Sequence, residues 1–379
     1  MKVFLSFLQS TIRHPIPAYD FWQYYIKNGI EEAGHEWTEC PDADWALGLV
    51  PQAPEQHTEW KERVWSQTIN WLRSNPVDLF LSYLYPEQID TSAINEIKRM
   101  GIPCVNFYCD NVRQFRTPPK EFSVFDLNWV PEYKAIKLYQ KAGYPYISLP
   151  MPMWIEPAKR KVYNETNNQV TFIGSKDIQR IHFFEKVIKQ CPSINLCIYG
   201  NGWKDVPQST VTIESGFNKI GYQFSFIKQH GVIPYLRKIK QRGLNTDISE
   251  ALRFQINDIT DFESYNKLTA ESMVTIGINR YPSYHYPLFK PDTYSRLRDI
   301  EAPMLGACYL TEYTEGLERL YEIGKEIETY TSPEDFIEKV DMLTANTDLR
   351  QRLKARGQKR ALDTHSIHNS IAQIIQRLI

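Results

Sequence analysis

The feature that most constrains the fold is a repeated alternation of short apolar runs with longer amphipathic stretches. In the first half of the chain, apolar runs at 77–84 and 102–108 enclose a stretch with helical spacing at 91–100. A strand, a helix and a second strand in this order form the unit from which parallel sheets are built. The sequence therefore predicts an α/β fold with parallel sheets.

The same alternation continues to the end of the chain. We expect strands at 2–8, 44–50, 77–84, 102–108, 125–130, 170–173, 194–199, 273–278 and 307–310. We expect helices at 19–33, 58–73, 91–100, 131–142, 178–190, 264–269, 336–343, 348–361 and 366–378. Residues 215–255 fit this alternation poorly and are interpreted as an insertion.

The length of the chain predicts two domains. A chain of 379 residues is too long for one compact core. Between 150 and 161, three prolines and three basic residues interrupt the pattern, as an interdomain linker would. We expect an N-terminal domain at 1–155, a second domain at 165–360 and a last helix at 361–379.

Composition excludes several classes of protein. The formal net charge of −1 disfavours a dedicated nucleic-acid binder, which normally carries a basic excess. The six cysteines form no Cys-x-x-Cys pair, so we expect buried free thiols in a reducing cytoplasm. The run 1–8 is too short for a signal peptide, and no segment approaches the length of a membrane span.

The stretch 296–312 carries the strongest candidate site. It predicts a short helix with Arg296, Arg298 and Glu301 on its polar side, then Gly306, then a buried strand at 307–310. Arg298 is suited to bidentate binding of a phosphate, and Glu301 to accepting a hydrogen bond from a ribose hydroxyl. Gly306 would allow the backbone to approach a ligand closely. The alternative is a surface salt bridge followed by an ordinary helix stop.

Further phosphate-site candidates follow expected strands, where ligands bind in open α/β sheets. They are Gly174, Ser175 and Arg180 after the strand at 170–173, Gly200, Asn201 and Gly202 after the strand at 194–199, and Arg280 after the strand at 273–278. These turns do not form a Gly-x-Gly-x-x-Gly motif, so a nicotinamide cofactor is disfavoured. Each arginine is also compatible with an ordinary surface charge.

Two residues after strands of the N-terminal domain are candidate general bases. His14 lies in the loop that follows the first expected strand, and Asp110 follows the strand at 102–108. The alternatives are a histidine that packs in a proline-braced turn and an aspartate that stabilises a local turn.

Several separated motifs resemble one enzyme family. Arg298-x-x-Glu301-Ala-Pro-x-x-Gly306-Ala, followed by 324–327 and 332–336, is similar to the donor half of spore-maturation-type, DUF3880-like glycosyltransferases. The blocks 170–175 and 196–203 fit the same family. The resemblance implies a GT-B architecture, in which two Rossmann-like domains face each other across a cleft. It also implies that the turns at 174–175 and 200–202 line a nucleotide-sugar pocket, with a nucleotide-diphosphate sugar as donor substrate and no other cofactor.

The resemblance also implies a mechanism. No Asp-x-Asp metal motif is recognised in the sequence, so we expect no metal at the site, with Arg180, Arg280 and Arg298 neutralising the diphosphate. Many retaining relatives carry a second glutamate eight positions before the one at Glu301. Thr293 occupies that position here, which favours inversion with His14 or Asp110 as base.

The acceptor and the cellular site remain broad expectations. The acceptor would be a glycan, a lipid-linked molecule or a small molecule. Residues 216–242 contain six Lys and Arg residues, several aromatic residues and no acidic residue. This segment either contacts the inner face of an anionic membrane, shapes an acceptor pocket, or forms a solvated helix that packs its apolar side on the domain.

Three other functions stay open at this point. A sugar-nucleotide epimerase of the same fold would act on the donor without an acceptor. A non-catalytic carbohydrate-binding protein would keep the fold but lose the arginines, which are present here. A two-lobed solute receptor is disfavoured because no export signal is found.

Overall fold

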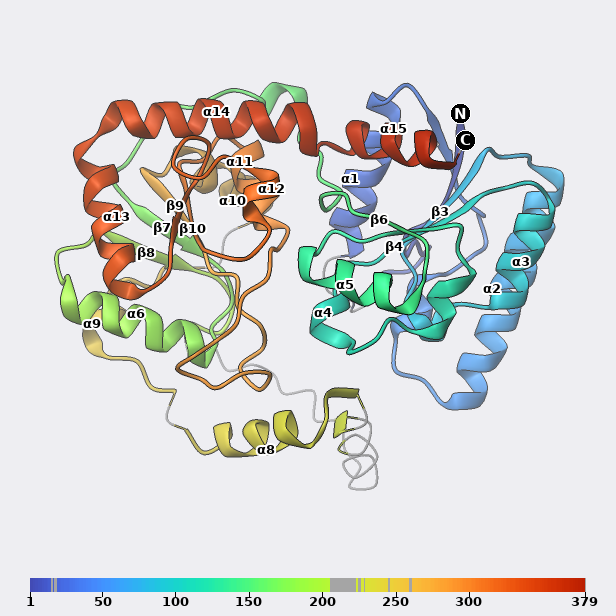
Figure 1. The fold of residues 1–379 in the computed structure, drawn as a ribbon, viewed down its shortest axis with the longest axis horizontal. Helices are drawn as coiled ribbons and strands as arrows, with labels where there is room; N and C mark the ends of the chain where they lie inside the picture. Colours follow the sequence, from blue (N-terminus) through green and yellow to red (C-terminus); the bar gives the residue numbers. More distant parts are fainter. Residues whose placement is uncertain are drawn as a thin grey trace. The chain divides into compact units, whose positions relative to one another are not determined.

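The computed structural model describes residues 1–14, 16, 19–204, 223, 226–227, 229–244, 246–258 and 261–378. The chain divides into two compact units. Unit 1 comprises Met1–Trp154 and Asp363–Ile379, and unit 2 comprises Ile155–Leu362. Each unit is built around one parallel sheet, which confirms the expected pair of α/β domains (Figure 1).

Unit 1 contains a six-stranded parallel sheet with the order β2-β1-β3-β4-β5-β6. Its strands are β1 (Lys2–Ser6), β2 (Glu36–Thr38), β3 (Leu79–Ser82), β4 (Cys104–Phe107), β5 (Leu127–Trp129) and β6 (Tyr146–Ile147). The central strands β3 and β4 are buried along their whole length. This explains why they appear in the sequence as continuous apolar runs rather than alternating ones.

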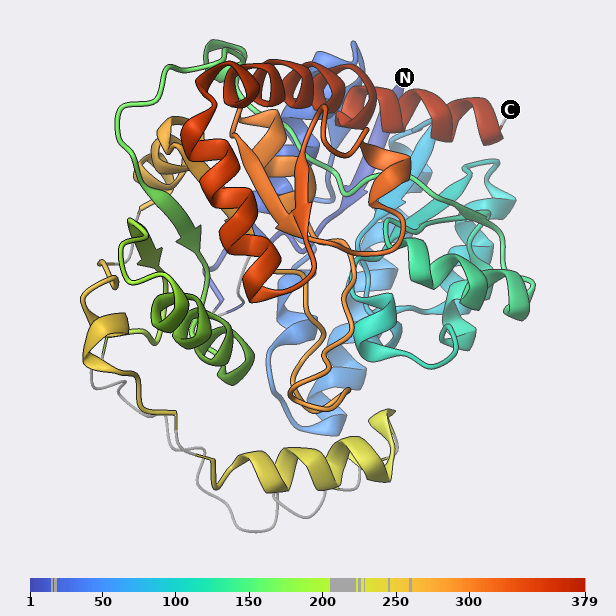
Figure 2. The same ribbon diagram turned by 60° about the vertical axis from the view of Figure 1, so that its left-hand side comes forward.

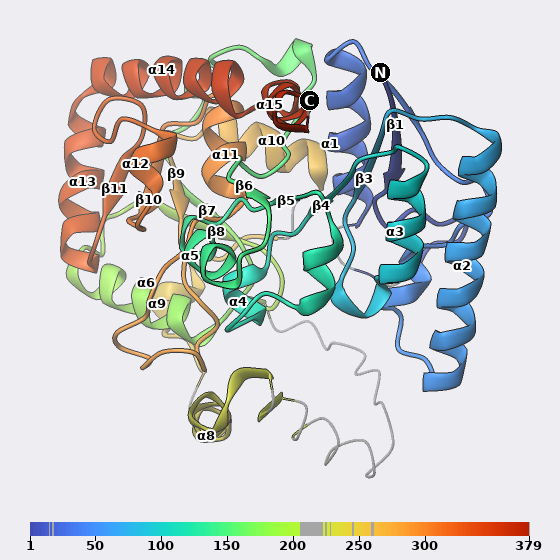
Figure 3. The same ribbon diagram turned by 45° about the vertical axis from the view of Figure 1, so that its right-hand side comes forward.

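Helices cover the sheet of unit 1. They are α1 (Tyr19–Glu32), α2 (Pro54–Ser74), α3 (Thr91–Arg99), α4 (Asn111–Gln114), α5 (Tyr133–Ala142) and α15 (Ile367–Leu378). The last helix, α15, packs against α1 within this unit (Figure 3). The contact is close, because a Cβ added at Gly29 would lie 2.6 Å from the side chain of Ile367.

The expected strand at 44–50 is wrong. Residues Ala46–Leu49 form a short 3-10 helix instead, and β2 lies earlier, at Glu36–Thr38. The Asp44 carboxylate accepts a hydrogen bond from the backbone N–H of Leu47 at 3.0 Å, which stabilises a turn rather than an extended chain. The apolar run is buried by packing against the ring of Trp60, which lies so close to Gly48 that a Cβ there would be 2.2 Å from it.

Unit 2 contains a five-stranded parallel sheet with the order β11-β10-β9-β7-β8. Its strands are β7 (Val170–Ile173), β8 (Leu196–Tyr199), β9 (Val274–Gly277), β10 (Tyr309–Glu312) and β11 (Glu328–Tyr330). Its helices are α6 (Ile178–Gln190), α8 (Val232–Gln241), α9 (Glu250–Arg253), α10 (Phe262–Glu271), α11 (Arg298–Met304), α12 (Leu317–Leu320), α13 (Pro333–Ala345) and most of α14 (Thr347–His365). Helices α6 and α13 pack against each other, and α10 and α11 contact the sheet at β7, β9 and β10 (Figure 2).

The strand order of each sheet contains one reversal. In unit 2 the chain moves from β7 outward to β8 and then returns to β9 on the other side of β7. In unit 1 the corresponding reversal lies between β1 and β3. Ligands of open α/β sheets bind at this switch point, outside the carboxyl ends of the strands. The candidate ligand-binding loops are therefore those after β7 and β9 in unit 2 and those after β1 and β3 in unit 1.

The helix expected near 298 has no polar side. Its residues Asp299 to Met304 are all buried, including the carboxylates of Asp299 and Glu301. The alternative of a surface salt bridge followed by a helix stop therefore does not describe α11. The insertion expected at 215–255 contains α8 and α9, while 215–222 lie outside the described residues.

In the described residues, no helix is long and apolar enough to cross a membrane.

All six cysteines are free thiols. Burial raises the pKa of the Cys308 thiol to about 12, so this thiol stays protonated near neutral pH.

Candidate functional site

Two glycine turns meet at the carboxyl ends of β7 and β8. The Gly174 carbonyl accepts a hydrogen bond from Trp203 Nε1 at 2.7 Å, and the Lys176 N–H donates to the Asn201 carbonyl at 2.8 Å. Gly200 has a φ of +129°, and a Cβ there would lie 2.4 Å from the Gly174 carbonyl oxygen. Only glycine fits this position, because the two turns pack tightly against each other.

Arg180 extends from the first turn of α6 back over the turn after β7. Its Nη1 donates to the Ser175 carbonyl at 2.6 Å, and its Nε lies 3.2 Å from the Asp177 carboxylate. Its guanidinium carbon lies 5.2 Å from the centre of the Phe172 ring. These contacts fix the guanidinium beside the switch point of the sheet.

Arg298 reaches the same place from α11. Its Nη2 donates to the Ile173 carbonyl at 3.1 Å, at the end of β7. Its guanidinium carbon lies 4.8 Å from the centre of the Tyr265 ring. Its buried Nη1 has no hydrogen-bond partner among the residues that the structure describes. Buried donors are normally satisfied in folded proteins, so this atom is a candidate donor to a bound ligand.

Arg280, after β9, is held by a carboxylate. Its Nε lies 2.8 and 3.0 Å from the two oxygens of Glu312, and its Nη1 donates to the Gln179 carbonyl at 3.0 Å. Burial raises the pKa of Glu312, and Arg280 opposes this shift. The Gln179 side chain also carries a buried donor, Nε2, without an acceptor in the described part of the chain.

Four guanidinium groups share this neighbourhood. The pKa of Arg180 is lowered, first by burial and then by the positive charges of Arg296, Arg298 and Arg280, while Asp177 opposes the shift. The pKa of Arg298 is raised, since the effect of burial is outweighed by its polar and acidic neighbours, with Tyr265 first and Glu301 next. Positive charges held together in this way favour an anionic ligand.

Glu301 lies beside Arg298 and is already engaged. The Tyr265 hydroxyl donates a short hydrogen bond to Glu301 Oε2. The pKa of Tyr265 is raised well above its usual value, mainly by burial, so this hydroxyl stays a donor.

Asp299 holds α11 in place. Its two carboxylate oxygens accept hydrogen bonds from five donors in the surrounding structure. The donors are Asn279 Nδ2, Ser295 Oγ, the Arg296 N–H, Tyr309 Oη and Thr311 Oγ1, at 2.8 to 3.2 Å. All five donors come from β10 or from the segment between β9 and α11. The network therefore fixes Arg298, the residue before Asp299, against the sheet.

One expected site residue is not brought to the arginines. Gly306 follows the carboxyl end of α11, at the opposite end of the helix from Arg298. Its φ is +78°, and a Cβ there would lie 3.0 Å from Gln358 Nε2 and 3.3 Å from the Lys161 carbonyl. Gly306 therefore ends the helix in a tight place rather than contacting a ligand at the switch point.

In unit 1, His14 forms a pair with a carboxylate. His14 Nε2 lies 2.9 Å from Asp44 Oδ2, and both side chains are largely buried. The backbone that carries His14 is constrained, because Leu8 has a φ of +59° and the Gln9 carbonyl accepts from the N–H groups of Trp45 and Ala46. A carboxylate that orients a histidine in this way is typical of histidines that act as general bases.

Asp110 lies directly before α4, after the end of β4. Its carboxylate is 3.8 Å from Arg113 Nη1, and its side chain does not cap the helix. Glu132 fixes this loop. Its carboxylate accepts hydrogen bonds from the Asn111 N–H at 2.9 Å and from Asn111 Nδ2 at 2.8 Å. Burial raises the pKa of Glu132 well above its usual range.

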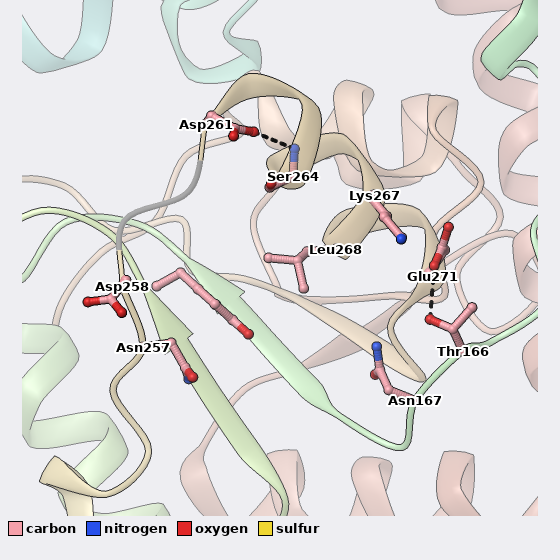
Figure 4. A pocket seen from close by; sticks show the side chains of 10 residues that line it. Thr166, Asn167, Asn257, Asp258, Asp261, Ser264, Lys267, Leu268 and Glu271 are labelled. Carbon is pink, nitrogen blue, oxygen red and sulfur yellow. Dashed lines mark hydrogen bonds between the residues drawn. The ribbon is translucent and has the colours of Figure 1, made fainter.

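A pocket of about 520 Å³ lies elsewhere in unit 2, between α10 and the strands β7 and β8 (Figure 4). Its charged lining consists of Asp258, Asp261, Glu271 and Lys267. The carboxylates are used internally. Asp261 caps α10 through Ser264, Glu271 accepts from Thr166, and Asp258 pairs with Lys204. An excess of carboxylates disfavours a phosphate ligand, so the arginine group is the stronger candidate for an anion site.

Four residues of this arrangement were not found from the sequence. Asp44, Tyr265, Asp299 and Glu312 have their roles only through contacts with distant parts of the chain or in a buried helix. The expectation that the sequence holds no Asp-x-Asp motif is wrong, because Asp42-Ala-Asp44 is such a pair. The structure shows Asp44 bonded to His14 and to the Leu47 N–H.

Comparisons with known proteins identify the family and the fold of the chain. Residues 179–376, more than half of the chain, match the model of a family described as glycosyl transferase-like. This match confirms the resemblance to GT-B glycosyltransferases, whereas the narrower likeness to the spore-maturation type stays a prediction. No curated protein matches the sequence.

Three solved structures are similar over nearly their whole length. Sucrose-phosphate synthase from Thermosynechococcus elongatus has 12% identity and a TM-score of 0.58, over 100% of this chain and 98% of that chain. Anabaena HepE in complex with UDP has 11% identity and a TM-score of 0.57, over 99% of each chain. A glycosyltransferase from Rickettsia africae has 8% identity and a TM-score of 0.57, over 99% of this chain and 97% of that chain. At such identities the likeness shows the fold alone.

Proposed function

The chain belongs to the glycosyl transferase-like family, and we propose that it transfers a sugar from a nucleotide-diphosphate sugar to an acceptor hydroxyl without a metal ion. The observation that carries this proposal is the placement of Arg180 and Arg298 at the end of β7, with Arg280 and Arg296 near enough to lower the pKa of Arg180. A nucleoside diphosphate leaving group develops negative charge as the glycosidic bond breaks. Fixed guanidinium groups stabilise that charge without reorganising.

The donor would be held by the turns and arginines of unit 2. In this proposal Arg298 Nη1, which lacks an acceptor in the described residues, donates to a diphosphate oxygen. The turn at 174–175 approaches the diphosphate with its backbone, and Glu301 accepts from a ribose hydroxyl. Arg280 is paired with Glu312, so we assign it a contribution through charge rather than direct contact.

A protein of the same fold supports this choice of donor. Anabaena HepE was solved in complex with UDP and, separately, with UDP-glucose. The identity is only 11%, so this supports the class of ligand and not the base or the sugar. We propose a nucleotide sugar as the donor of this chain on the combined strength of the family and the arginine group.

His14 is the preferred base. With Nε2 donating to Asp44, the other ring nitrogen, Nδ1, is the proton acceptor. In the proposed step Nδ1 takes the proton of the acceptor hydroxyl, whose oxygen forms a bond to the anomeric carbon. The bond from that carbon to the diphosphate breaks, and the nucleoside diphosphate leaves with the electron pair. Attack from the face opposite the leaving group inverts the anomeric configuration.

Asp110 stays the second candidate base. Its carboxylate follows the end of β4 and lies 3.8 Å from Arg113 Nη1. The acceptor remains a glycan, a lipid-linked molecule or a small molecule. We also propose that the protein acts in the cytoplasm, because all six cysteines are free thiols, and that it works at the inner face of the membrane.

A panel experiment tests the proposal directly. Thermal unfolding is measured with UDP, GDP, ADP and CDP and with the corresponding nucleotide sugars. A bound ligand at about 100 times its Kd stabilises the protein by about 2.7 kcal/mol, which is visible as a rise in Tm. The stabilising donor is then incubated with and without a mixture of acceptors. Transfer that requires an acceptor supports the proposal, whereas an altered sugar formed from the donor alone would indicate an epimerase.

A further inference from the structure

Helix α8 lies in unit 2 with its apolar side exposed. The large apolar side chains of Val232, Ile233, Leu236 and Ile239 are 57%, 63%, 58% and 44% exposed, and Leu244 just beyond the helix is 40% exposed. These are five of the thirteen exposed large apolar side chains in the described chain. The positions i, i+4 and i+7 of Val232, Leu236 and Ile239 form one stripe along the helix.

The opposite, polar side of α8 attaches it to unit 2. Arg237 Nη1 donates to the His285 carbonyl, and Gln241 exchanges two hydrogen bonds with Ser283 at 2.9 and 2.6 Å. The ammonium of Lys238 lies 4.1 Å from the centre of the Phe226 ring. In each view of the ribbon, α8 lies at the tip of the loop that contains residues 281–286 (Figures 1 to 3).

This orientation is the reverse of the usual one for a surface helix. A surface helix normally buries its apolar stripe against the domain and turns its charged side to water. The alternative from the sequence, a solvated helix that packs its apolar side on the domain, therefore does not describe α8. An exposed stripe of this kind marks a surface that binds a partner or a membrane.

The charge next to the stripe identifies the kind of partner. Between 229 and 244 the chain carries four Lys and Arg residues and no Asp or Glu, although the whole protein has a formal net charge of −1. Lys240 and Arg242 are exposed. Two copies of this surface would repel each other. An apolar stripe flanked by cations is the pattern of helices that lie in the interface of an anionic bilayer.

We propose that α8 binds the surface of an anionic membrane, inserting Ile233, Leu236 and their apolar neighbours among the lipids while Lys240 and Arg242 contact the phosphates. The hydrogen bonds of Arg237 and Gln241 then hold unit 2 at the membrane. Binding in this way is independent of whether the proposed sugar transfer is correct. It would place the transferase where lipid-linked acceptors are found.

Vesicle sedimentation tests the proposal. The full-length protein is mixed with vesicles of phosphatidylcholine alone or of phosphatidylcholine with phosphatidylglycerol, at low and at high salt. The double variant Ile233→Glu/Leu236→Glu places two negative charges in the exposed apolar surface of α8. Phe254→Glu is the matched control, because Phe254 is 79% exposed but lies directly after α9, outside the stripe. Both changes are at exposed positions, and circular dichroism checks that each variant is folded.

We expect the wild type and Phe254→Glu to bind phosphatidylglycerol vesicles at least tenfold more tightly than phosphatidylcholine vesicles, with binding weakened by salt. The double variant should lose at least tenfold in affinity, and Lys240→Glu/Arg242→Glu should lose the preference for phosphatidylglycerol. Unchanged binding by the double variant, or equal binding to both lipids by the wild type, would overturn the proposal. Dimers in light scattering that the double variant abolishes would assign the stripe to a second copy of the chain instead.

Discussion

Arg298 Nη2 donates a hydrogen bond to the Ile173 carbonyl at 3.1 Å, although the two residues lie 125 positions apart in the chain. This bond joins the first residue of α11 to the last residue of β7. It places a guanidinium at the switch point of the sheet, where the loops after β7 and β9 meet. The proposed donor site depends on this placement, and so do the predictions below.

Removal of the Asp299 carboxylate should destabilise unit 2. Asp299→Ala leaves five donors without their acceptor in a buried place, and hydrogen bonds to charged groups contribute about 1.5 to 3 kcal/mol each. We expect the free energy of unfolding to fall by about 3 kcal/mol or more, measured by urea denaturation. Asp341→Ala, at an exposed position of α13, is the control and should change it by less than about 0.5 kcal/mol.

A methyl group at Gly200 should disturb the turn that carries Gly174. Gly200 has a φ of +129°, and the new Cβ would lie 2.4 Å from the Gly174 carbonyl, so the turn has to shift. We expect Gly200→Ala to destabilise the protein by about 1 to 3 kcal/mol and to weaken nucleoside diphosphate binding. Gly243→Ala is the control, because nothing lies within 4 Å of its added Cβ. Equal affinities in the two variants would show that the turn does not contact the ligand.

The alternation of apolar runs and helices was sufficient to predict two parallel-sheet domains. Helix α6 occurs at Ile178–Gln190, where it was expected, because its cap Asp177 and its apolar spacing are local signals. The strand expected at 44–50 failed, because Trp60 and Gln9 determine the conformation of that run from a distance. Periodicity alone does not distinguish a buried strand from another buried segment of this length.

The candidate site was only partly predictable. Arg298 and Glu301 were found because they stand together in one short motif, but their burial was not expected. Tyr265 and Glu301 are 36 positions apart, and His14 and Asp44 are 30 apart. No local pattern in the sequence links such pairs, since they meet only when the chain has folded. Gly306 was expected at the site because of its motif, and the structure gives it a role as a helix stop.

The pair of His14 and Asp44 should control turnover rather than donor binding. We expect His14→Ala to lower kcat at least about 100-fold, as loss of a general base does. Asp44→Asn keeps the shape but presents an amide to Nε2, which disfavours the tautomer that accepts a proton at Nδ1. It should lower kcat at least about tenfold and leave the affinity for nucleoside diphosphate unchanged. His368→Ala, at an exposed position of α15, is the control. Full activity of His14→Ala would leave Asp110 as the remaining candidate.

Lys354 should make the stability of unit 2 depend on alkaline pH. Its Nζ donates to the Ala270 carbonyl in a buried place, and burial lowers the pKa of its ammonium. Between the lowered pKa of the folded state and about 10.4 for the unfolded chain, the unfolded state binds more protons, so stability rises with pH. We expect the free energy of unfolding of the wild type to rise with pH relative to Lys354→Met in this window. A constant difference between the two proteins would contradict the assignment.

The central claim is that Arg298 binds the diphosphate of the donor, and calorimetry of nucleoside diphosphate binding tests it most directly. The ligand is the diphosphate that raises Tm most in the panel, and Arg356→Ala, at an exposed position of α14, is the control. We predict that Arg298→Ala, shown to be folded by circular dichroism, binds at least about tenfold more weakly, since a charged hydrogen bond contributes about 1.5 to 3 kcal/mol. Arg298→Lys should fall between the two, because it keeps the charge but loses the planar geometry. An affinity of Arg298→Ala equal to that of Arg356→Ala and the wild type would contradict the account.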